Sequence, residues 1–182
     1  MTGAVTSLNA LITQATEMLN KEVLTTQEAK DALSKAIESA NAAAEGELTL
    51  EIYTEQVDAL NAAIKAGNEA ITAAAALETK YDTHQDKVSG TGEGSYEDYV
   101  DTEGYEELAD VLVEIDDKIN GEGIFASMAE IDDYNTKLDR AYSKMMSGGI
   151  DFSTASKDTP VDATNLIINP SFQKRTYDES AG

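Results

Sequence analysis

Among the side chains whose types could perform chemistry, His84 is the first to consider. It is the only histidine in the chain, which has no cysteine. A di-iron site in a helical bundle needs Glu-x-x-His pairs on facing helices, but Tyr81 stands three residues before His84. No motif around any serine supports a triad with His84 as the base. We therefore interpret His84 as a partly exposed helical residue, and we predict no catalytic residue and no enzyme.

A glycine-rich segment at 90–94, Gly-Thr-Gly-Glu-Gly, has a composition that could suit a phosphate-binding loop. It lacks the Lys-Ser/Thr pair of a P-loop, and no strand precedes it as dinucleotide binding would require. The carboxylate of Glu93 would also repel a phosphate group. We interpret the segment as a linker between helices and predict no cofactor.

Acidic residues are densest between Glu93 and Asp139, where neighbouring pairs such as Asp116–Asp117 and Asp132–Asp133 could offer oxygen ligands to Ca²⁺. Neighbours on a helix point about 100° apart, so an adjacent pair cannot easily chelate one ion. EF-hand spacing is absent. A pair of carboxylates could also serve a glycosidase, but acids are so plentiful that no pair stands out. We expect a solvated acidic face and no metal site.

Tyr96, Tyr99 and Tyr105 are clustered at the start of a predicted helix. Aromatic rings with polar tips suit the stacking of sugars or contacts with a protein. They equally suit the end of a helical bundle, where a wide apolar ring closes the core. Both interpretations stay open, and these three tyrosines are the candidate binding residues.

The charge of the chain limits its partners. There are 35 acidic and 13 basic residues, which give a formal net charge of −22. Nucleic acid and anionic membrane surfaces are poor partners, because both are bound through lysine and arginine. No stretch approaches the ~20 consecutive apolar residues that span a bilayer, so no membrane insertion is expected. Without cysteine, disulfides and thiolate metal sites are excluded.

The elements that must position these residues are predicted to be helices. Alanine is abundant, and the only prolines are Pro160 and Pro170, so long helices can form before them. Apolar residues recur at three- and four-residue spacing over residues 2–21, 27–44, 50–87, 96–120 and 124–146. The fourth segment is expected to falter at 101–104.

Helix ends have signals of their own. Thr25 or Thr26 is expected to cap the second helix, with Thr25 and Glu28 in capping-box spacing, and Thr49 the third. Gly46 is expected to end the second helix in a left-handed conformation. Gly67 lies on the apolar stripe of the third helix, which suggests a close helix crossing.

These patterns predict an all-α fold, an up-and-down helical bundle of about five helices with an extended C-terminal tail. The bundle is expected over 1–148, and it divides naturally into a three-helix unit at 1–88 and a helical pair at 95–148. In one arrangement the third helix is shared between two halves. A polar linker is expected at 149–163.

The last residues have a different pattern. Residues 165–172, Asn-Leu-Ile-Ile-Asn-Pro-Ser-Phe, predict a short β-strand followed by an Asn-Pro turn. A lone strand has no partner for its backbone groups. We therefore expect 164–182 to be the truncated first strand of a following domain.

Two parts of the chain resemble known protein modules. Leu8-Asn-Ala-Leu-Ile-Thr-Gln-Ala15, Leu33-Ser-Lys-Ala-Ile-Glu-Ser-Ala-Asn-Ala42 and Val57-Asp-Ala-Leu-Asn-Ala-Ala-Ile64 resemble FIVAR-type modules, small three-helix bundles of large bacterial cell-wall and carbohydrate-active proteins. The segment from Ala163 to Phe172 resembles the opening strand of galactose-binding-like β-sandwich modules in secreted bacterial glycan-processing proteins. The rest of such a sandwich is missing, so its ligand site is carried over to no residue here.

The resemblances imply an extracellular or cell-surface bacterial protein in which this bundle is an accessory module. We expect a non-catalytic spacer or interaction module, linked to glycan binding or processing, whose partners are neighbouring domains of the same parent protein. The alternative is a module that binds a glycan or a surface protein through an exposed cluster of Tyr96, Tyr99 and Tyr105.

Overall fold

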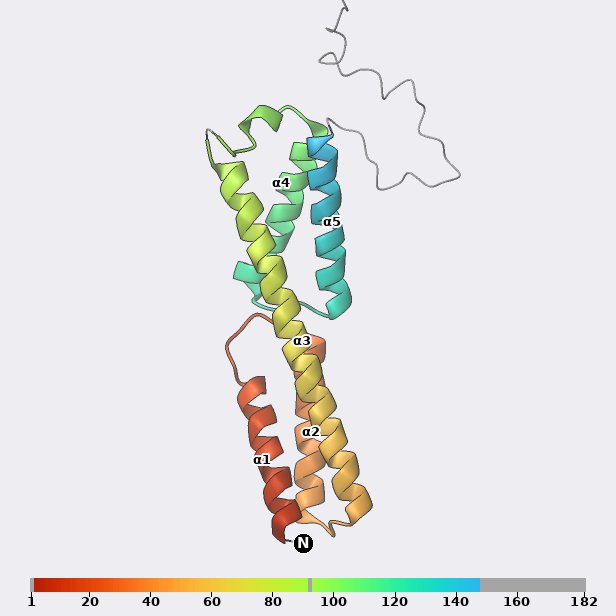
Figure 1. The fold of residues 1–182 in the computed structure, drawn as a ribbon. Coiled ribbons are helices and arrows are strands. Elements are labelled where there is room, and N and C mark those ends of the chain that lie inside the picture. Colours follow the sequence, from red (N-terminus) through yellow and green to blue (C-terminus); the bar gives the residue numbers. More distant parts are fainter. Residues whose placement is uncertain (1, 92, 148–182) are drawn as a thin grey trace, which may run out of the picture.

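The structure is a computed structural model that describes residues 2–91 and 93–147. Within these ranges the chain forms five α-helices that run alternately up and down, which confirms the predicted all-α bundle (Figure 1). The helices are α1 (Thr2–Leu19), α2 (Gln27–Glu45), α3 (Leu50–Ser89), α4 (Glu103–Asp116) and α5 (Met128–Met146). A short 3₁₀ helix, η1 (Glu97–Tyr99), precedes α4, and a π-helical turn, η2 (Asp117–Glu122), follows it. The expected linker at 149–163 and strand at 164–182 lie outside the described residues.

The helices do not share one core. α1 and α2 pack against the first half of α3, and we call this unit the first bundle; α4 and α5 pack against its second half and form the second bundle. The two bundles lie end to end along α3, as Figure 1 shows. With 40 residues, α3 is about 60 Å long at 1.5 Å per residue.

The buried residues of α3 form one continuous stripe. Nine of the ten follow one another at alternating spacings of four and three residues, and the tenth, Ile64, lies beside them: Gln56, Leu60, Ala63, Gly67, Ala70, Ala74, Leu77, Tyr81 and His84. Such a 3.5-residue repeat drifts only about 20° per seven residues around an α-helix. One side of α3 therefore serves both bundles.

Threonine and serine hydroxyls begin most of these helices. The side chains of Thr26, Thr49, Thr102 and Ser127 each accept a hydrogen bond from the backbone N–H three residues later. Of the two residues proposed for the start of α2, Thr26 is the cap. The expected left-handed ending at Gly46 is wrong, because Gly46 has an extended backbone, with φ −97° and ψ −159°.

Two predicted boundaries are also wrong. The fifth helix begins at Met128 instead of residue 124, because Phe125 pairs with the loop between α1 and α2 and Ser127 has an extended backbone. The fourth segment is not one helix from residue 96 to residue 120. It breaks before Thr102, as expected, but its end widens into the π-helical η2 and stops at Gly123, which has a left-handed φ of +69°.

Two glycines allow helices to approach closely. A Cβ on Gly104 would overlap the backbone nitrogen of Met145, so α4 and α5 touch backbone to backbone there. The cation of Lys144 pairs with Glu103 and Glu107 on either side of Gly104. A Cβ on Gly67 would meet the sulfur of Met18 at 2.6 Å and a methyl carbon of Leu33 at 3.3 Å, so side chains of α1 and α2 occupy the space beside Gly67.

Alanine substitutions should distinguish these two contacts. Gly104→Ala pushes a methyl group into fixed backbone, so we expect it to lower the free energy of unfolding by about 3 kcal/mol or more. Gly67→Ala meets the far end of a flexible methionine, and the higher helix propensity of alanine offsets part of its cost, so a change of about 1 kcal/mol or less is expected. Urea titration of both variants measures the difference. Equal losses would contradict this account of the α4–α5 contact.

Candidate functional site

His84 lies inside the end of the second bundle that is remote from α1, which we call the far end. Only 8 % of its surface is exposed, so the expectation of a partly exposed histidine is wrong. Its Nδ1 lies 2.9 Å from the hydroxyl of Tyr96, and the ring of Tyr142 lies 4.9 Å away between centroids. Burial lowers the pKa of His84 below its ordinary 6.5, and the charges of Lys87 and Lys80 lower it further. The ring is therefore neutral near pH 7, and it packs in the core against Tyr96 and Tyr142.

The three candidate tyrosines share this end of the molecule but not the same exposure. Tyr96 is 5 % exposed, and burial and its contacts with Tyr142 raise its pKa to about 12. It is a core residue and cannot belong to an exposed cluster. Tyr99 meets Tyr96 edge to face at 6.5 Å, and both Tyr99 and Tyr105 are half-buried against the second core. Recognition of a glycan or protein through Tyr99 and Tyr105 stays a prediction.

The glycine-rich segment joins α3 to η1. Gly94 has a left-handed φ of +89°, which suits a tight change of direction. Just after it, the backbone N–H of Tyr96 donates to the carbonyl of Lys87 at 3.0 Å and folds the chain back on the end of α3. The described part of the segment thus acts as a connection that delivers Tyr96 to the core.

The acidic pairs do not converge on a common point. Asp116 accepts hydrogen bonds from Tyr81 and from Asn120, each at 2.7 Å, and these bonds lower its pKa. Asp133 pairs with Lys137 at 3.2 Å. Among the described residues, no group of three or more histidine, cysteine, aspartate or glutamate side chains could hold a metal ion.

Three lysines instead connect the acids of the second bundle, and each lies between two carboxylates. Lys118 contacts Glu122 and Glu130, Lys137 contacts Glu114 and Asp133, and Lys144 contacts Glu103 and Glu107. Each of these lysines bridges α5 to α4 or η2. Most of the carboxylates are exposed, so each pair contributes little to stability, but together they reduce the repulsion between neighbouring acidic helices.

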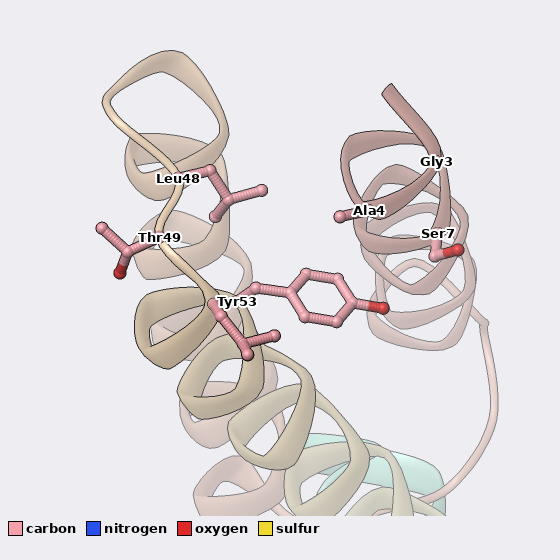
Figure 2. Close-up of a pocket in the computed structure, with 7 residues that line it drawn as sticks. Gly3, Ala4, Ser7, Leu48, Thr49 and Tyr53 are labelled. Carbon is pink, nitrogen blue, oxygen red and sulfur yellow. The ribbon is translucent and has the colours of Figure 1, made fainter. Parts of the chain in front are cut away.

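Two hollows in the surface of the first bundle are shallow and mostly apolar. The hollow in Figure 2 has a volume of about 350 Å³ and lies between the start of α1 and the turn that joins α2 to α3. The side chain of Tyr53 crosses this hollow toward Ser7, and Ala4 and Leu48 lie at its edge. A second, about 390 Å³, is a groove between α2 and α3 lined by alanines, Lys35 and Ser39. Neither brings together the several polar groups that orient a small ligand.

The most specific contact in the molecule lies where the two bundles meet, a level we call the waist. The segment Thr25–Glu28 runs parallel to Phe125–Ala126 and is joined to it by backbone hydrogen bonds. Phe125 N–H donates to Thr25 O at 3.0 Å, Gln27 N–H to Phe125 O at 2.7 Å, and Glu28 N–H to Ala126 O at 3.1 Å. We call these three bonds the waist clip. Thr25, Thr26 and Phe125 are all buried.

The sequence does not predict the waist clip, although it contains one local signal for the segment that enters α5. Ser127 and Glu130 have Ser-x-x-Glu spacing, which marks a helix start. The hydroxyl of Ser127 accepts from the N–H of Glu130, and the carboxylate of Glu130 accepts from the N–H of Ala126. This capping box places 124–126 before the helix. Their pairing partner, a hundred residues away in the chain, has no local signal.

Comparison with known proteins returned no match: no family model matches the chain, and no curated protein or solved structure does either. None of the helices in the described ranges is both long enough and apolar enough to cross a membrane. Inferences about function therefore rest on the geometry and on the resemblances of the sequence.

The buried His84 should make stability depend on pH. The pKa of His84 is lower in the folded state than in the unfolded state, so the unfolded state binds a proton more readily. The free energy of unfolding therefore keeps its full value above pH 6.5 and decreases as the pH falls below that value. Urea titration of the wild type and of His84→Gln at about pH 7.5 and about pH 5 measures this. We expect the wild type to lose stability relative to the variant at the lower pH. A difference that stays constant with pH would contradict a lowered pKa.

Proposed function

We propose that this chain is a non-catalytic spacer module, a stiff helical rod that holds neighbouring domains of a parent protein apart. The observation that carries the proposal is the direction of the chain. It begins at the free end of the first bundle and, after five helices, reaches Ser147 at the far end of the second bundle (Figure 1). Domains attached at opposite ends of the rod are thus held apart by its length.

The internal structure of the rod supports this function. α3 runs through both bundles without interruption, and apolar side chains pack on it along almost its whole length. A helix supported in this way resists bending far better than an isolated one. The charge of −22 keeps such an elongated surface soluble and discourages association between copies.

The parent protein is proposed from sequence alone. The similarity of the first three helical segments to FIVAR-type modules, and of residues 163–172 to the start of a galactose-binding-like sandwich, supports an extracellular or cell-surface bacterial protein concerned with glycan binding or processing. In such a protein the rod would hold a glycan-binding or catalytic domain away from the cell surface.

Distance measurements test the spacer proposal directly. The chain has no cysteine, so spin labels attach only at introduced ones. Glu47→Cys and Asp98→Cys place labels at exposed positions near the two ends of α3. Since α3 has 40 residues, a single narrow distribution near about 60 Å is expected from electron–electron double resonance.

A second label pair is the control. Glu51→Cys and Lys65→Cys are exposed positions within the first half of α3, 14 residues apart, and should give about 21 Å whether or not the waist bends. If this pair gives its expected distance while the end-to-end pair is broad or much shorter, the chain is not a stiff spacer.

A binding screen separates the spacer from the alternative module. The isolated protein is expected to bind nothing on a glycan array, because Tyr99 and Tyr105 are half-buried against the second core. Binding that Tyr99→Ala abolishes and that Asp98→Ala, an exposed neighbour in η1, leaves intact would favour recognition through the tyrosines and contradict a pure spacer.

A further inference from the structure

The waist is the weak point of a rod built in this way, because α3 is the only helix of the described residues that crosses it. The other four helices begin or end there. Gly67 and a run of alanines at 73–76 give α3 small side chains near this level, so few bulky contacts hold the two bundles in line. A single helix between two rigid bodies bends and twists more readily than a helix within a bundle.

Side-chain packing at the waist is incomplete. On one side lies a hollow of about 260 Å³, lined by residues of the first bundle, among them Ala29 and Ala66, and by Met128 of α5. Another, of about 370 Å³, lies between the loop that follows α1 and the end of η2, with Leu24 and Ile119 among its lining residues. Both hollows are open to the surface, so side chains bridge the two bundles over only part of the waist.

The waist clip supplies what the packing lacks, a second attachment beside α3. Its three backbone bonds join the loop that enters α2 to the segment that enters α5. Side chains anchor both strands of the clip: Phe125 is fully buried and contacts the ring of Tyr134, while Leu24 packs against the second core from the first bundle. Directional bonds between backbone groups tolerate little change of angle.

We propose that the waist clip is a latch that holds the two bundles in line, and that opening it turns the middle of α3 into a hinge. The inference rests on the proposed spacer function, since it explains how the spacer stays straight. It assigns the stiffness of the waist to three hydrogen bonds instead of to the helix alone.

Gln27→Pro tests the latch with little harm to the helix. Gln27 is the first residue of α2, where proline is well tolerated, and Thr26 before it already has the extended backbone, φ −112° and ψ 148°, that proline requires of its neighbour. Proline removes the N–H that donates to Phe125 and places a ring carbon against that carbonyl. Leu50→Pro is the matched control, because Leu50 is the exposed first residue of α3 at the opposite end of the first bundle.

Spin labels at Glu38→Cys on α2 and Asp110→Cys on α4, both exposed, report the angle between the bundles. The wild type and Leu50→Pro should give one narrow distance distribution, and Gln27→Pro one at least about twice as wide. Circular dichroism should show unchanged helix content in both proline variants. A Gln27→Pro distribution as narrow as that of the wild type would overturn the latch.

Hydrogen exchange gives a test that needs no variant. The amides of Gln27, Glu28 and Phe125 should exchange slowly and with similar protection factors, because opening of the clip exposes them together. Exchange of these amides at the rate of unprotected loop residues would also overturn the proposal. If the wild type has the expected end-to-end distance but Gln27→Pro does not change the angle between the bundles, the latch alone is refuted. If the end-to-end distance of the wild type is short or broad, the spacer is refuted.

Discussion

The structure depends on one helix that serves as a wall of two hydrophobic cores. The buried residues of α3 follow a 3.5-residue repeat from Gln56 to His84, so the same side of the helix receives α1 and α2 along its first half and α4 and α5 along its second. Neither pair of helices has a core without α3, because each pair leaves one face of its apolar surface open. Every other feature of the rod, including its length and the separation of its ends, follows from this sharing.

A shared helix joins the bundles but does not by itself define the angle between them. That angle is set where the chain returns to the waist twice, once on entering α2 and once on entering α5. The two returning segments meet there, with Thr25, Thr26 and Phe125 buried, and their backbone groups pair with each other. This backbone pairing joins two units that side-chain packing only partly connects.

The residues with chemical potential are used in the interior and at helix ends. His84, Tyr96 and Tyr142 close the far end of the second core, and Tyr81 holds Asp116 through a hydrogen bond. Lys118, Lys137 and Lys144 connect acidic helices. The surface of the described residues is acidic and its hollows are shallow. Such a surface suits a module that sets the distance between its neighbours.

The amino-acid sequence by itself determined the helices, their approximate ends and the long third helix, because three- and four-residue apolar spacing and Thr or Ser caps are local signals. It offered a third helix shared between two halves as one arrangement. Only the tertiary structure decided that the core is divided in this way, that His84 and Tyr96 are buried, and that the fifth helix begins after residue 127. These features arise from contacts between segments far apart in the chain. Phe125 has an apolar side chain that would suit a helix, and its backbone is extended because its N–H and carbonyl bond to Thr25 and Gln27.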